Sequence, residues 1–212
     1  MSTVKKSKTQ EYIKTIVFMV AITFLFIAPL SFAYLKTKDM VKQNELMFLK
    51  KAVLYSANIK YPDGAKVSDI DPIYNKYVAE IRNPEGKILY YQIKDPDSGG
   101  SIKGYAYVTS GPGLWGEITG VVGVAPDKKT VTGVEFIKQG ETPGLGARIE
   151  EVWFKEQFRG KTGPFNKTVA EKDPAGADQF QAITGATITS DGVKKLLNKT
   201  FTDLPKITQD GK

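Results

Sequence analysis

The sequence predicts an α+β protein in which a single N-terminal transmembrane helix precedes one domain with an antiparallel sheet and flanking helices. Three observations support this prediction: an uncharged apolar run, five strand-like segments after it, and two helix-like segments nearer the C-terminus. Strands followed by helices are typical of α+β folds. About 170 residues follow the apolar run, which is enough for one domain.

The apolar run Ile16–Tyr34 is the first element, and it contains no charged residue. At about 1.5 Å per residue, a helix of this length crosses a bilayer core of roughly 30 Å. We therefore expect a cytoplasmic tail over residues 1–15 and a transmembrane helix over residues 16–35. A cleavable signal peptide is the alternative, because Ser31-Phe32-Ala33 resembles a cleavage site. Both interpretations send the rest of the chain across the membrane.

Residues 36–60 have helical spacing and are interpreted as a membrane-proximal amphipathic helix that continues the transmembrane helix. Four residues share one of its faces: Leu46, Leu49, Val53 and Ala57. Packing of this face on the chain's own domain is favoured over binding of a partner. The extracytoplasmic domain then spans residues 61–212, and it opens with the turn-forming residues Tyr61-Pro62-Asp63-Gly64.

Short segments rich in β-branched and aromatic residues follow, and turn-forming Asn, Asp, Pro and Gly residues separate them. Such turns join neighbouring strands into hairpins, so the sheet is expected to be antiparallel. The predicted strands are Tyr77–Arg82, Lys87–Lys94, Lys103–Thr109, Glu117–Ala125 and Thr130–Ile137. The helices predicted after them are Ala147–Phe158 and Asp191–Phe201.

The segment Ile183–Ser190 reads Ile-Thr-Gly-Ala-Thr-Ile-Thr-Ser and directly precedes the second of these helices. Gly185 and Ala186 are small enough for the backbone to approach an anion, and amides that open a helix attract anions. Thr189 or Ser190 is the predicted N-cap of this helix. The segment therefore indicates a phosphate-binding turn beside a free hydroxyl, with an ordinary helix cap as the alternative.

Thr184-Gly185-Ala186-Thr187 resembles the [Ser/Thr]-Gly-Ala-Thr signature of a covalent FMN-binding domain. This domain occurs in the C subunit of the sodium-translocating NADH:quinone reductase and in the G subunit of the Rnf electron-transport complex. In that family the last Thr of the signature carries FMN through a phosphoester bond. The resemblance therefore implies covalent FMN on Thr187, with Thr184, Gly185, Ala186, Thr189 and Ser190 around it.

A second segment, Gly140–Gly146, resembles the family's recurrent Glu-Thr-Pro-Gly-Leu-Gly sequence. Pro and Gly here predict a tight turn whose backbone can lie against a ligand. Because this loop lines the flavin in the family, the resemblance implies contacts from Glu141, Thr142, Leu145 and Gly146. A plain loop before the next helix is the alternative.

A third segment, Gly113-Leu114-Trp115-Gly116, is similar to the C subunit in particular. Residues 111–116 also match the letters Gly-x-Gly-x-x-Gly, but a strand follows them, whereas a dinucleotide-binding fingerprint requires a helix. We expect Trp115 to lie near the flavin pocket or a partner surface, with a core position as the alternative. The chain departs from the family pattern at Gln181, where an Asp is usual, and Asp178 lies three residues too early.

The composition excludes several kinds of chemistry. The chain has no Cys and no His, which rules out Cys-ligated iron–sulfur clusters, thiolate or His zinc sites and Ser-His-Asp catalysis. We therefore predict no catalytic residue and no metal site, and redox chemistry requires an organic cofactor. Residues 1–38 contribute +5 of the net charge of +7, so the domain is nearly neutral and nucleic acid is not an expected partner.

The resemblance implies an electron-transfer flavoprotein subunit of an ion-translocating oxidoreductase complex in the bacterial inner membrane, with its flavin domain on the extracytoplasmic side. The expected partners are the membrane, the other membrane subunits and a flavin transferase, and the chain is not expected to be an enzyme on its own. A membrane-anchored module that binds FMN or another phosphate ligand noncovalently is one alternative. A flavin domain that feeds a separate periplasmic reductase is another. Chain length favours the G subunit, whereas Gly113–Gly116 favours the C subunit.

Overall fold

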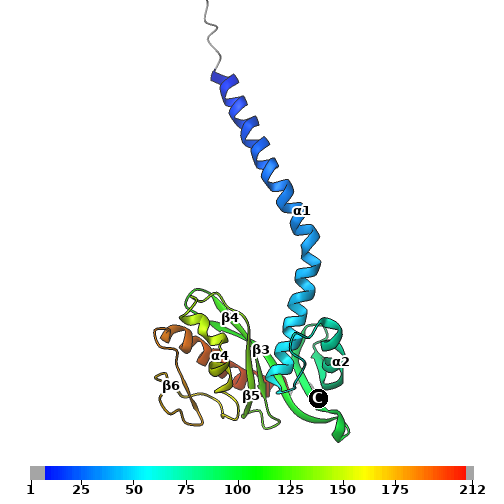
Figure 1. Ribbon diagram of the computed structural model, residues 1–212, viewed down its shortest axis with the longest axis vertical. Helices are drawn as coiled ribbons and strands as arrows, with labels where there is room; N and C mark the ends of the chain where they lie inside the picture. Colours follow the sequence, from blue (N-terminus) through cyan, green and yellow to red (C-terminus); the bar gives the residue numbers. More distant parts are fainter. Residues whose placement is uncertain (1–7, 209–212) are drawn as a thin grey trace, which may run out of the picture. The chain divides into compact units, whose positions relative to one another are not determined.

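The computed structural model describes residues 8–208 and divides the chain into two compact units, residues 1–46 and residues 47–212 (Figure 1). The predicted tail, residues 1–15, lies partly outside the described residues. Helix α1 (Lys8–Ser56) runs through the first unit and into the second without a break. It therefore includes both the predicted transmembrane segment and most of the predicted helix over residues 36–60.

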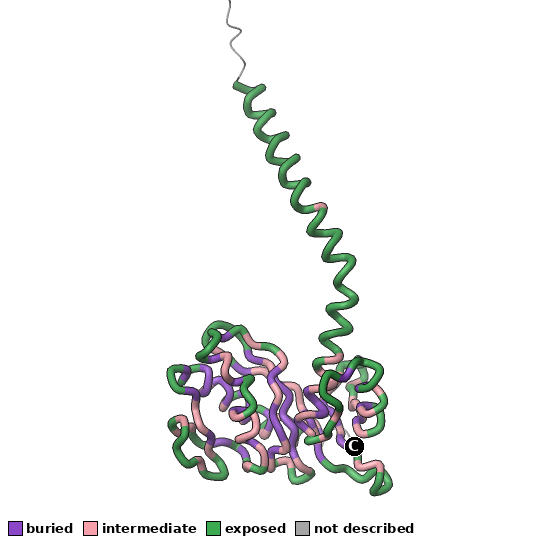
Figure 2. The backbone as a smooth tube through the Cα atoms, viewed as in Figure 1, coloured by how far each residue is buried: buried purple, intermediate pink, exposed green. Residues whose placement is uncertain are grey.

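The described part of the first unit is the exposed part of α1, and this helix is long and apolar enough to cross a membrane (Figure 2). Its threonine hydroxyls donate to carbonyls of the same helix, as Thr23 does to Met19 at 2.7 Å and Thr37 to Ala33 at 2.9 Å. Side-chain polar groups satisfied in this way are compatible with a lipid environment. The assignment of residues 16–35 to the membrane stays a prediction.

The second unit contains a five-stranded antiparallel sheet in the order β1-β2-β3-β4-β5, so each strand pairs with its neighbour in sequence. The strands are β1 (Val78–Arg82), β2 (Ile88–Asp95), β3 (Ser101–Pro112), β4 (Glu117–Val124) and β5 (Val131–Lys138). All five predicted strands and the antiparallel sheet are confirmed. The α+β fold class is confirmed with them.

Each face of the sheet carries its own hydrophobic core, because alternate residues of a strand point to opposite faces. On β4, Val122 packs into the core beneath helix α4 (Thr187–Ile207), whereas Val121 packs into the core beneath the end of α1 and helix α2 (Val67–Tyr77). The sheet therefore lies between two helical layers, and its strands β4 and β5 are largely buried (Figures 1 and 2).

The C-terminal end of α1 is tied to the sheet by hydrogen bonds to its last carbonyl oxygens. Thr132 donates its hydroxyl to the Ser56 carbonyl at 2.7 Å, and Arg159 donates to the Tyr55 carbonyl at 3.2 Å. The Arg159 guanidinium also pairs with Glu156, which accepts a hydrogen bond from the Tyr55 hydroxyl. Burial, followed by the Glu156 carboxylate, raises the pKa of Tyr55 to about 12, so this hydroxyl remains a donor.

The prediction of one continuous helix over residues 147–158 is wrong. The structure has a 3₁₀ turn, η2 (Gly146–Glu150), followed by the short helix α3 (Val152–Glu156). The break falls at Glu151, whose backbone is extended with φ −64° and ψ 142°. Its carboxylate accepts hydrogen bonds from Arg148 in η2 and from Trp153 in α3. These two contacts connect the segments on either side of the break.

Two further parts of the fold were not predicted from the sequence. Helix α2 has Pro72 in its interior, a residue that normally argues against a helix. The parallel strands β6 (Lys167–Val169) and β7 (Gln179–Gln181) are only three residues each and are too short for a periodic signal. This pair brings the chain back to the start of α4.

Candidate functional site

Helix α4 begins at Thr187, four residues before the predicted start at Asp191. The prediction that Thr189 or Ser190 caps the helix is therefore wrong, because Ala186 occupies the N-cap position and has no side-chain cap. The Ser190 hydroxyl instead accepts from the Ile183 amide at 3.1 Å and donates to the Ala186 carbonyl at 3.0 Å. Thr187 is thus the first residue of the helix.

Two glycines allow α4 to approach the sheet closely. A Cβ atom built on Gly192 would lie 1.9 Å from the Pro112 carbonyl oxygen of β3, and one on Gly111 would lie 2.9 Å from the Gly192 carbonyl oxygen. Any larger residue at Gly192 would force the helix away from the strand, since backbone atoms cannot yield. The N-terminal end of α4 is therefore seated directly on the end of β3.

A cavity of about 280 Å³ opens at this end of α4. It lies between the loop after β3, the loop before η2 and the first turn of α4. Its lining residues are Leu114, Glu141, Thr142, Leu145, Gly146, Gly185, Ala186, Thr187, Ile188 and Thr189. The segments Gly140–Gly146 and Ile183–Ser190, which both carry the family resemblance, therefore contribute to one cavity although they lie far apart in the chain.

The backbone amides of Thr187, Ile188 and Thr189 belong to the first turn of α4, where amides have no acceptor within the helix. No acceptor for them is recorded among residues 8–208. Acidic residues are absent from this described first turn, and Thr187 is exposed. Free amides at a helix N-terminus attract phosphate groups, so the site pairs an anion-binding end with an accessible hydroxyl.

Glu141 connects the three segments around the cavity. Its side chain is only 5% exposed, and one carboxylate oxygen accepts from the amides of Leu114 at 3.0 Å and Trp115 at 3.1 Å. The other oxygen accepts from the Thr189 hydroxyl. A Cβ on Gly146 would lie 2.8 Å from this carboxylate, so glycine is needed there. The geometry gives Glu141 the role of holding the walls of the cavity in place.

Apolar side chains surround the mouth of the cavity and remain exposed. Leu114, Leu145 and Ile188 line it and are 51%, 44% and 59% exposed. Trp115 does not line the cavity, but its indole N–H donates to the Thr142 hydroxyl at 3.0 Å. Because Trp115 is 71% exposed, the alternative that it belongs to the core is wrong.

Two lining residues were not predicted from the sequence, and two predicted residues besides Trp115 lie outside the cavity. Leu114 and Ile188 were missed, although each adjoins a residue that was predicted. Thr184 and Ser190 do not line the cavity: the Ser190 hydroxyl bonds to the backbone of Ile183 and Ala186, and the Thr184 amide donates to Glu171. Eight of the predicted positions do line it: Glu141, Thr142, Leu145, Gly146, Gly185, Ala186, Thr187 and Thr189.

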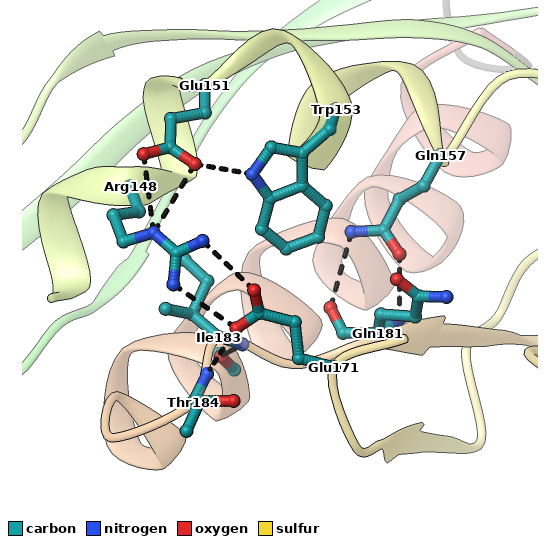
Figure 3. A network of polar contacts seen from close by, with 9 residues as sticks. Arg148, Glu151, Trp153, Gln157, Glu171, Gln181, Ile183 and Thr184 are labelled. Carbon is teal, nitrogen blue, oxygen red and sulfur yellow. Dashed lines mark hydrogen bonds and ion pairs between the residues drawn. The ribbon is translucent and has the colours of Figure 1, made fainter. Parts of the chain in front are cut away.

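Gln181, where the chain departs from the family pattern, lies outside the cavity lining as well, and it takes part in a network of polar contacts with Gln157 (Figure 3). Its backbone amide donates to the Gln157 side chain at 2.7 Å, and its own side chain donates to the Asp173 carbonyl at 2.9 Å. Gln181 therefore supports the loop before the cavity instead of contributing a group to it.

Comparison with known proteins identifies this kind of site. The model of the FMN-binding domain family matches residues 113–202, which include every cavity segment. The G subunit of the ion-translocating oxidoreductase complex of Methanosarcina acetivorans is 32% identical over 192 residues, covering 91% of this chain and 94% of the relative. The C subunit of the Na⁺-translocating NADH-quinone reductase of Vibrio alginolyticus is 34% identical over 124 residues, covering 55% of this chain and 47% of the relative.

A solved structure shares the fold as well. The C subunit of the Na⁺-translocating NADH-quinone reductase from Parabacteroides distasonis superimposes with a TM-score of 0.64 at 26% identity, covering 80% of this chain and 95% of that one. Fold and site thus define an FMN-binding domain that follows an apolar N-terminal helix. The chain belongs to the family of FMN-binding subunits of ion-translocating oxidoreductases, which includes these G and C subunits.

Proposed function

We propose that this protein is an electron-carrying subunit of a membrane-bound ion-translocating oxidoreductase and holds FMN by a phosphoester to Thr187. The observation that carries the proposal is the position of Thr187, whose exposed hydroxyl stands beside the unpaired amides of α4. The alignment covers 94% of the Methanosarcina acetivorans G subunit but 47% of the Vibrio alginolyticus C subunit, which favours the Rnf-type G subunit.

The residues of the cavity fit the parts of FMN. The amides of Thr187, Ile188 and Thr189 suit a phosphate, and the exposed Leu114, Leu145 and Ile188 provide an apolar wall for a ring system. A volume of about 280 Å³ lies near the lower end of ligand pockets, about 300–1,000 Å³, so part of the cofactor would stay exposed. Exposure of this kind suits electron exchange with a partner protein.

When bound, the flavin supplies the electron-accepting chemistry, and the chain's residues bind and orient it. A phosphoester to Thr187 needs an activated donor, such as a flavin dinucleotide presented by a transferase. The Thr187 oxygen then forms the new P–O bond, the pyrophosphate P–O bond breaks and a nucleoside monophosphate leaves. The hydroxyl proton passes to a base of the transferase.

The apolar part of α1 is assigned to the membrane in this proposal. Residues 16–35 span the bilayer once, and the domain from residue 61 onward lies on the extracytoplasmic side of the inner membrane. Because the run 16–34 contains no charged side chain, it offers no path for an ion. Ion translocation is therefore assigned to other subunits of the complex, and this chain acts as one relay within it.

Two substitutions of the same residue test the attachment. We expect the full chain, produced together with a flavin transferase, to keep an FMN-sized mass adduct and flavin fluorescence after denaturation. Thr187→Val has the same shape without the hydroxyl and is expected to lose both signals. Thr187→Ser retains a hydroxyl and is expected to keep them. Retention of the adduct in Thr187→Val would refute this attachment site.

A second measurement addresses the alternative functions. FMN that is bound before denaturation but released after it would indicate a noncovalent module, the alternative that the Gln181 departure leaves open. Copurification of the tagged chain with integral-membrane redox subunits is expected for a subunit of a complex. Isolation as a reductase that is active alone would contradict the proposed function.

A further inference from the structure

A cluster of polar groups joins two of the segments that form the cavity (Figure 3). Arg148 in η2 makes two hydrogen bonds to the Glu171 carboxylate, at 3.0 and 3.2 Å. Glu171 also accepts a hydrogen bond from the backbone amide of Thr184 at 2.9 Å. We call the Arg148 side chain, the Glu171 side chain and the Thr184 amide the clasp.

The clasp connects two segments of the site through residues that do not line it. Arg148 lies two residues after Gly146, and Thr184 directly precedes Gly185, whereas Glu171 comes from the loop between β6 and β7. A direct ligand of FMN would face the cavity, and neither Arg148 nor Glu171 does so. Their geometry therefore fits a supporting role.

Contacts other than those to Glu171 also fix the Arg148 side chain. Its Nε atom lies 3.3 Å from both carboxylate oxygens of Glu151, and its guanidinium carbon lies 5.6 Å from the centre of the Trp153 ring. The Trp153 N–H also donates to Glu151. A guanidinium fixed on several sides presents its donors to a carboxylate in one orientation, so little freedom is lost when the pair forms.

The clasp acts on a tight turn that leads directly to Thr187. The Ala186 amide donates to the Ile183 carbonyl at 3.0 Å, and Gly185 within the turn has a left-handed backbone with φ +78°. A Cβ on Gly185 would lie 3.2 Å from Leu145 across the cavity. Holding the Thr184 amide therefore fixes the turn that sets the position of the first residue of α4.

We propose that Arg148 and Glu171 are positioning residues for the attachment of FMN: they hold the Thr184 amide and thereby aim the Thr187 hydroxyl at the phosphorus of the flavin donor. This inference rests on the proposed function, because it concerns the same attachment. Group transfer depends steeply on alignment, and a displacement of about 1 Å can cost on the order of 10²-fold in rate.

The test compares three variants of the full chain with one matched control. Glu171→Ala removes the carboxylate that accepts from both Arg148 and the Thr184 amide. Glu171→Gln keeps an acceptor for the Thr184 amide, and Arg148→Lys keeps the charge without the two-pronged geometry. The control is Glu135→Gln, which breaks an ion pair to Lys155 of similar length, 2.9 Å, and similar burial, away from the cavity.

The first readout is the rate of attachment with flavin adenine dinucleotide and a purified transferase, measured by intact mass at several concentrations of the chain. We expect Glu171→Ala to lower kcat by about tenfold or more with little change in KM, since only alignment is lost. Glu171→Gln and Arg148→Lys should fall between Glu171→Ala and the unmodified chain. Glu135→Gln should match the unmodified chain.

The second readout is amide hydrogen exchange over residues 183–187 before any flavin is attached, so it does not depend on the proposed function. We expect the amides of residues 183–187 to exchange faster in Glu171→Ala than in the unmodified chain. In Glu135→Gln they should exchange at the rate of the unmodified chain. Faster exchange with an unchanged attachment rate would overturn the positioning role and leave the proposed function intact. Absence of the adduct in the unmodified chain would refute covalent attachment, and with it this inference.

Discussion

The last turn of α1 and the first turn of α4 both pack on the sheet, yet they differ in whether their terminal backbone groups are hydrogen-bonded. At the end of α1, the carbonyls of Tyr55 and Ser56 accept hydrogen bonds from Arg159 and Thr132. At the start of α4, the amides of residues 187–189 have no recorded acceptor within the described part of the chain. One helix end is closed by its own protein, and the other is left open.

Glycines bring both helix ends close to the strands. A Cβ on Gly123 would lie 2.1 Å from the Ser56 carbonyl oxygen, much as one on Gly192 would lie 1.9 Å from that of Pro112. Close packing therefore does not distinguish the two ends. What differs is that the contacts at α1 use its terminal carbonyls, whereas those at α4 leave its terminal amides free. A rigidly seated helix end with unpaired amides marks the end that can bind an anion.

The largest effect on this comparison is expected from Gly192→Ala at the open end. The added methyl group meets the Pro112 carbonyl, so we expect a loss of about 3 kcal/mol of unfolding free energy, at the upper end of the usual cost of overpacking. FMN attachment should fall as well, because α4 moves. Urea denaturation of the full chain in detergent measures the loss. Gly176→Ala, where a methyl group has only ordinary contacts, is the control.

A smaller effect is expected from Arg159→Ala at the closed end. It leaves the Tyr55 carbonyl without this donor, and we expect a loss of about 2 kcal/mol in the same measurement. FMN attachment should be unchanged, because Arg159 does not touch the cavity. Lys194→Ala, which breaks a partly exposed ion pair to Asp191, should cost less than about 0.5 kcal/mol. Impaired attachment in Arg159→Ala would show that the two ends are coupled.

The smallest effect is a pH dependence at the clasp. Hydrogen bonds from Arg148, and then from the Thr184 amide, lower the pKa of Glu171 to about 2. Because the folded state prefers the charged form, the stabilisation is complete above the unfolded pKa of about 4.3 and is lost as pH falls toward 2. The urea midpoint of the unmodified chain should exceed that of Glu171→Gln by a constant amount above about pH 5. The gap should close in acid; a gap that persists at pH 2 would contradict this.

The sheet was predictable because its signals are local. Strand-forming residues and turn residues lie next to one another in the chain, and the observed strands end within three residues of the predicted ones. Thr187 and the loop at residues 140–146 were reached through a short motif match. A match of that kind names residues, but it gives no account of how they meet.

The errors arose where contacts between distant residues decide the local structure. The predicted helix over residues 147–158 is interrupted because Glu151 binds Arg148 and Trp153. The start of α4 was misplaced because Thr189 and Ser190 are good caps by type, but each has another partner here. Thr189 donates to Glu141, which is 48 residues away, and Ser190 binds the backbone at Ile183.

The sequence by itself determined the α+β class, the apolar N-terminal helix, the five strands and the two segments that carry the family resemblance. Hydropathy, strand propensity and turn chemistry act over a few residues, so they can be read in order along the chain. Only the tertiary structure decided that Glu141 joins three walls of one cavity, that Glu171 binds both Arg148 and the Thr184 amide, and that α4 begins at Thr187. These features depend on pairs of residues far apart in sequence, whose meeting is set by packing on the sheet.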